Sequence, residues 1–87
     1  MKTLTVYVTR EDIKHGKRGS WVGCPIALAL ERRRNVEYAH VAFASAAILF
    51  KGDSTPTNSI LPEKARIFIN MFDSNARVSP IRFKLTV

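Results

Sequence analysis

The sequence predicts a small α+β domain of two layers, in which about four mostly antiparallel strands carry helices on one face. Segments 3–9 and 81–87 alternate apolar and polar residues, as half-buried strands do. Segments 25–34 and 61–75 instead repeat apolar residues at helical spacing. The predicted elements follow the order β-α-α-β-β-α-β, which is typical of an α+β fold.

Length and composition indicate a single domain, residues 1–87. The chain has 87 residues, of which 46% are hydrophobic and 24% are charged. This balance is that of a globular protein and not of a disordered tail. A chain of this size forms one core, and the sequence contains neither internal repeats nor a domain linker.

The first strand, 3–9, leads into a short helix with the sequence REDIKH, residues 10–15. Thr9 followed three residues later by Asp12 resembles a capping box, in which each residue bonds to the backbone N–H of the other. Gly16 is a suitable end for this helix. The strand and the helix are therefore expected to follow each other directly.

Residues 16–23, GKRGSWVG, contain three glycines and no periodicity, which indicates a loop. Pro25 suits the first turn of the next helix, because a proline there lacks only an N–H that would have no partner. Either Cys24 or Gly23 is expected to cap it. The arginines at 32–34 are expected in its last turn, where positive charge complements the helix dipole.

Residues 36–51 are rich in residues that favour strands and contain neither glycine nor proline. We expect one strand near 36–43 and another near 46–51, with a tight turn or bulge around Ser45. The alanines leave a helix possible here. Residues 52–59, GDSTPTNS, consist of turn residues and are predicted to be a loop.

The clearest helix is 61–75. Pro62 and Glu63 suit its first turn, and its apolar stripe consists of Ala65, Phe68, Ile69 and Phe72. The last strand, 81–87, is amphipathic. We expect the two terminal strands to lie side by side.

The charge of the chain indicates a polyanionic partner. Fourteen Lys and Arg against seven Asp and Glu give a net charge of +7 and a pI near 10.2. Such a field attracts polyanions, of which nucleic acid is the commonest in a cell. The alternative is that the charge only keeps a small protein soluble.

The candidate binding residues are cations on both sides of the helix that Pro25 begins, one tryptophan between them, and two cations of the last strand. They are Lys14, Lys17, Arg18, Trp21, Arg32, Arg33, Arg34, Arg82 and Lys84. An exposed Trp21 could stack on a base or anchor a protein partner. The alternative is that Trp21 fills the core. Arg82 and Lys84 share the polar face of their strand and extend the basic surface if that face is uncovered.

Cys24 is the natural candidate for a nucleophile. A thiol at a helix N-terminus near Lys17 and Arg18 is favoured as thiolate, and His15 could act as its base. Such a pair also needs an orienting group and an oxyanion site, of which the sequence gives no independent sign. We therefore expect a buried or capping thiol, no catalytic residue and no enzyme activity.

No cofactor or metal is expected either. His15 and His40 lie far apart in sequence, without the spacing of a metal site. The segment GKRGS, residues 16–20, departs from the nucleotide-binding loop pattern because its lysine precedes the second glycine. It remains suited to non-specific contact with a phosphate.

The sequence favours a cytoplasmic protein without a membrane partner. Its first residues lack the apolar block of about 7 to 15 residues of a secretion signal. The longest apolar run, near 41–50, is shorter than the ~20 residues of a membrane span. The single cysteine, Cys24, fits a reducing compartment.

Several motifs extend over most of the chain: VTREDIKHG, GCPIALAL and LPEKARIFINMFD. With these motifs the chain resembles a set of small bacteriophage and bacterial proteins. The matching pieces are Thr9–Ile13, Gly16, Cys24–Ala29, Leu61–Asp73 and Pro80–Val87. The resemblance implies no particular activity, but a small viral protein often acts by occupying a host surface, as anti-CRISPR inhibitors of host defence do.

These observations predict a non-enzymatic basic binding module that engages nucleic acid or a nucleic-acid-containing complex. The second hypothesis is a stoichiometric inhibitor that binds a host protein around an aromatic anchor. The third is an enzyme that uses Cys24 and His15.

Overall fold

The computed structural model describes residues 3–42 and 44–87, and its order of elements confirms an α+β fold. Within these residues lie five strands and three helices. They are β1 (Thr3–Val8), α1 (Arg10–His15), α2 (Pro25–Glu31), β2 (Val36–Val41), β3 (Ser45–Phe50), β4 (Thr57–Ile60), α3 (Glu63–Asp73) and β5 (Ile81–Thr86).

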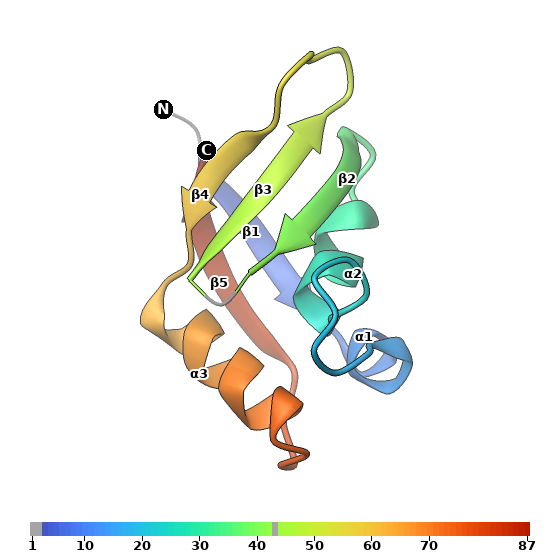
Figure 1. Cartoon of the computed structure of the whole chain (residues 1–87), viewed down its shortest axis with the longest axis vertical. Helices are drawn as coiled ribbons and strands as arrows, with labels where there is room; N and C mark the ends of the chain where they lie inside the picture. The colour runs from blue at the N-terminus through green and yellow to red at the C-terminus, as the bar shows by residue number, and fades with distance from the viewer. Residues whose placement is uncertain (1–2, 43) are drawn as a thin grey trace.

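The strands form two antiparallel sheets. The terminal strands β1 and β5 pair along their whole length, with Thr3 opposite Thr86 and Val8 opposite Ile81, as predicted. The second sheet is the meander β2-β3-β4. Figure 1 shows this meander in front of the β1–β5 pair, with α1 and α2 along one side and α3 at one end.

Strand β4 lies partly where the sequence predicts a loop. Its residues, TNSI, have no alternating apolar pattern that would predict a strand. The strand is held instead by backbone pairing with β3 and by one polar side chain. Ser59 is buried, and its hydroxyl donates a hydrogen bond to the Thr86 carbonyl at 2.8 Å. This bond joins β4 to β5, and hence the two sheets to each other.

The strands β2 and β3 occur as predicted, with different limits. β2 ends at Val41, and position 43 of the predicted strand lies outside the described residues. The predicted tight turn is present: the Ala42 N–H donates to the Ser45 carbonyl at 2.9 Å, and Ser45 is the first residue of β3. A separate irregularity lies between Val36 and Tyr38, where the register with β3 shifts.

The helices begin where capping chemistry predicts. Thr9 and Asp12 form the predicted capping box at α1. Cys24 is the N-cap of α2, and its sulfur accepts a hydrogen bond from the Ala27 N–H at 3.4 Å. Pro62 is the N-cap of α3 and does not lie within its first turn. Gly16 makes room for α2, because a Cβ there would lie 2.6 Å from the Pro25 ring.

The core lies between the sheets and the helices. Helix α2 packs on both β1 and β2 and buries Ile26 and Leu30 completely. Phe68 and Phe72 of α3 are also buried. Burying an aliphatic or aromatic side chain of this size contributes about 1.5–3 kcal/mol, so α2 and α3 hold the sheets in place.

The end of α2 bonds to one edge strand of each sheet, β2 and β1. Glu31 accepts a hydrogen bond from the Ala39 N–H of β2 at 3.2 Å. Arg32 donates to the Tyr7 carbonyl at 3.0 Å, and Arg33 donates to the Thr5 carbonyl at 2.9 Å, both on β1. The prediction that the arginines fill the last turn of the helix is therefore wrong: α2 ends at Glu31, and the arginines follow it.

Candidate nucleic-acid interface

The outer face of the β1–β5 sheet is uncovered and basic. Alternation along the two strands turns Leu4, Val6 and Val8 inward and the intervening residues outward. We call the outward set the basic sheet face: Thr3, Thr5, Tyr7, Arg82, Lys84 and Thr86. Thr5 is half-buried and the others are exposed. The set contains two cations and no carboxylate, so it attracts anions.

Tyr7 and Arg82 lie at one end of this face, and Thr5 and Lys84 form the pair next to them. Tyr7 and Arg82 are directly opposite each other in the strand register. The guanidinium carbon of Arg82 lies 5.7 Å from the centroid of the Tyr7 ring, and Arg82 Nη1 donates to the Tyr7 hydroxyl at 3.4 Å. The ring stays 54% exposed, so a planar ligand can reach it. This arrangement pairs an aromatic platform with a fixed cation.

Sequence reasoning missed Tyr7. The alternation in 3–9 does place it on the polar side of its strand, beside threonines. An aromatic side chain on the polar side of a terminal strand, expected beside a second strand with Arg82 and Lys84, is the signal that could have identified it.

Two further cations border the basic sheet face. Arg33 is bound to the Thr5 carbonyl, and Lys64 of α3 donates to the Arg82 carbonyl at 3.2 Å. Both bond to neutral oxygens and keep their charge at the rim. Arg32 differs, because its guanidinium lies 2.6 Å from the carboxylate of Asp12, which offsets its charge. The arginines predicted as one run therefore have different roles: Arg32 pairs with Asp12, and Arg33 bonds to the Thr5 carbonyl. Arg34, which follows them, is exposed.

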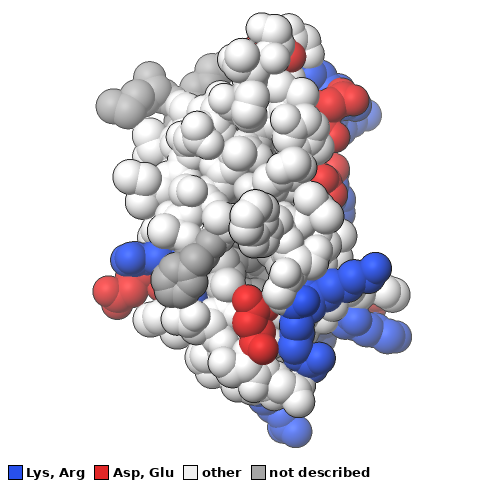
Figure 2. Space-filling view, viewed as in Figure 1, with Lys and Arg blue, Asp and Glu red and all other residues white. Residues whose placement is uncertain are grey.

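The other predicted residues belong to α1 and to the α1–α2 loop, residues 16–23. Lys14, Lys17 and Arg18 are exposed, and Trp21 is 68% exposed, so it does not fill the core. Arg18 donates to Asn75 and lies over the Phe72 ring at 5.8 Å. Figure 2 shows the largest group of Lys and Arg at the lower right edge, with others at the upper right and on the left, while the face over the three-stranded sheet is almost free of them.

This loop is exposed but well fixed. The Lys17 N–H donates to the Gly23 carbonyl at 2.7 Å, and the Trp21 carbonyl accepts from the Val41 N–H at 2.7 Å. The Gly19 N–H donates to an Asp73 oxygen at 3.0 Å. The structure therefore separates the predicted site into the basic sheet face and this loop.

Cys24 is placed as a structural residue. It is buried, and burial raises the pKa of its thiol above the ordinary value of 9.0. The thiol therefore keeps its proton at neutral pH, when a nucleophile would need to lose it. His15, its predicted base, is exposed and lies 3.3 Å from Glu11.

No protein-family model matches the chain, and no curated protein or solved structure does either. Across residues 3–42 and 44–87, no three His, Cys, Asp or Glu side chains are grouped so that they could hold a metal ion. In the same residues, no helix has both the length and the apolar character needed to cross a membrane. On the basic sheet face, the described surface offers a ligand an exposed aromatic ring, Tyr7, beside a cation, Arg82.

Proposed function

We propose that this protein is a non-enzymatic binding module that engages single-stranded nucleic acid through the basic sheet face. One observation carries the proposal: Tyr7 is half-exposed on a sheet surface, directly opposite Arg82 and diagonal to Lys84, with no carboxylate in the outward set. Exposed aromatic rings stack on bases, and the cations beside them bind the phosphates.

The preference for a single strand follows from Tyr7. Stacking on an aromatic side chain contributes about 1–3 kcal/mol per base and requires a base that is free of its duplex partner. The six-residue strands give a face about 20 Å long at a rise of about 3.3 Å per residue. The face is held by the β1–β5 ladder, so little conformational entropy is lost on binding.

The direct test is fluorescence anisotropy of a labelled single-stranded oligonucleotide at increasing salt. Arg33, Lys64, Arg82 and Lys84 can each neutralise a phosphate. Each phosphate neutralised on a single strand contributes about −0.7 to the slope of log K against log salt, so we expect a slope of about −3. Binding that is insensitive to salt, or tighter binding to a duplex of the same sequence, would contradict the proposal.

A second candidate function is stoichiometric inhibition of a host protein, and exposed Trp21 favours it. A tryptophan on a fixed loop is a typical interface anchor. An affinity pulldown from a bacterial lysate with and without nuclease separates the two functions. A protein partner should be captured after nuclease treatment and lost in Trp21→Ala. If all captured protein disappears with nuclease, this second function is excluded.

A further inference from the structure

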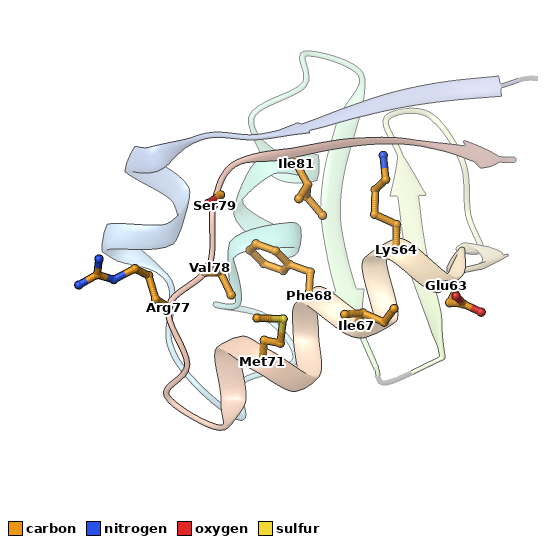
Figure 3. Close-up of a pocket in the computed structure, with 9 residues that line it drawn as sticks. All are labelled: Glu63, Lys64, Ile67, Phe68, Met71, Arg77, Val78, Ser79 and Ile81. Carbon is orange, nitrogen blue, oxygen red and sulfur yellow. The ribbon is translucent and has the colours of Figure 1, made fainter.

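An open apolar groove lies between α3 and the segment that leads into β5. Its volume is about 450 Å³. Its apolar lining comes from Ile67, Phe68, Met71, Val78 and Ile81. Figure 3 shows these side chains between the helix and the opposite segment. Ile67 is 50% exposed and Met71 is 41% exposed, although both belong to a helix whose other face is buried. The groove is thus a surface whose apolar side chains remain in contact with water.

One wall of the groove is formed by Arg77, Val78 and Ser79, a segment outside any strand. Asn75 has a φ of 64°. Figure 3 shows the chain turning away from the end of α3, running past Arg77, Val78 and Ser79, and then entering β5. Within the described residues, Arg77, Val78 and Ser79 form no backbone hydrogen bond. Backbone N–H and C=O groups in this state can accept a further extended chain, as an open strand edge does.

The charges at the groove define what it can hold. Lys64 and Arg77 lie toward its two ends, and Glu63 is the one carboxylate among its lining residues. The whole chain carries a net charge of +7. This charge opposes a second copy in the groove and attracts an acidic segment.

We propose that this groove binds an extended acidic segment of a partner protein. The segment adds its backbone to residues 77–79 and places alternate apolar side chains against Ile67, Phe68 and Met71. Alternation follows from the two-residue period of an extended chain, and strand addition of this kind is a general mode of peptide recognition. Ile67, Met71 and Arg77 are not part of the basic sheet face, so variants at these positions test the groove separately from nucleic-acid binding, whereas Lys64 borders both sites.

A random-peptide display library tests the proposal. Selection on the wild-type protein, with the Ile67→Ser/Met71→Ser variant for counter-selection, should enrich acidic peptides with apolar residues at every second position. The best peptide is then synthesised with a fluorescent label. Its affinity should fall at least about tenfold for the double variant, because two apolar contacts are lost. Ile60→Ser is the matched control, since Ile60 is 84% exposed on β4, and it should bind as the wild type does.

A second pair of variants keeps the test decisive if the double variant folds poorly. Arg77→Glu should weaken binding of the acidic peptide, whereas Lys51→Glu, in the β3–β4 turn, should not. The proposal is overturned if no peptide is enriched, if enriched peptides are basic or have helical spacing, or if Arg77→Glu binds like Lys51→Glu. Sedimentation that shows dimers lost in Ile67→Ser/Met71→Ser would assign the groove to self-association instead.

Discussion

The end of α2 and the basic sheet face both carry closely spaced cations, yet the structure uses them differently. Arg32 and Arg33 donate to carbonyls of β1, and Arg32 also pairs with Asp12. Arg82 and Lys84 instead project from β5 into solvent, and the Arg82 guanidinium lies beside the Tyr7 ring and hydroxyl. The comparison teaches that the net charge of a chain does not equal the charge available to a ligand.

The largest effect is expected at the end of α2. Asp12 is 5% exposed, and Arg32→Ala removes an ion pair at 2.6 Å as well as the bond to the Tyr7 carbonyl. Hydrogen bonds to charged groups contribute about 1.5–3 kcal/mol, so the free energy of unfolding should fall by about that much in urea denaturation. Arg34→Ala is the control with the same change of charge. Equal free energies of unfolding for Arg32→Ala and Arg34→Ala would show that Arg32 is not held by its bonds to Asp12 and Tyr7.

The next effect is expected on the basic sheet face. Tyr7→Ala should weaken binding of a single-stranded oligonucleotide by about 1–3 kcal/mol, or roughly 5- to 150-fold, because a stacking platform is lost. The salt slope should stay unchanged, since no cation is removed. Tyr7→Phe keeps the ring and should bind nearly as well as the wild type. If Tyr7→Phe loses as much affinity as Tyr7→Ala, stacking is not the cause.

Lys84→Ala sharpens the comparison by removing charge alone. Its slope of log K against log salt should be shallower than that of the wild type by about 0.7, the contribution of one phosphate on a single strand. Lys51→Ala, an equally exposed lysine in the β3–β4 turn, should keep the wild-type slope. Anisotropy titrations at several salt concentrations measure both variants, and an equal change in both would indicate binding by net charge only.

The smallest effect concerns the other end of α2. Burial raises the pKa of Cys24 in the folded state, so the unfolded chain loses the thiol proton first as pH rises. The stability that the buried thiol contributes is present below about pH 9 and is lost above it. Urea denaturation at neutral and alkaline pH should show that the free energy of unfolding of the wild type falls relative to that of Cys24→Ser above that pH. A constant difference would contradict a protonated structural thiol.

Much of the fold follows from local sequence patterns, but the edge strand β4 does not. Alternation predicts β1 and β5, and Thr9, Asp12 and Pro25 mark the helix starts. The strand β4 could not be predicted, because it depends on backbone pairing and on a bond from Ser59 to a residue far along the chain.

In the candidate site too, local patterns predict some features, whereas others depend on contacts between distant residues. The alternation in 81–87 correctly places Arg82 and Lys84 on an exposed face. The contacts of Arg32 and Arg33 join residues that lie 25 and 28 positions apart, so no local pattern reports them. The alternation places Tyr7 on the polar side of β1, but only the β1–β5 register places it opposite Arg82.

The most direct test of the central claim is a titration of isotope-labelled protein with a single-stranded oligonucleotide at low salt, followed by amide chemical shifts in NMR spectra. The account predicts that the largest shift changes lie in β1 and β5, at Thr5, Tyr7, Arg82 and Lys84, with few in β2 and β3. Changes confined to the α1–α2 loop around Trp21, or no changes at all, would contradict it.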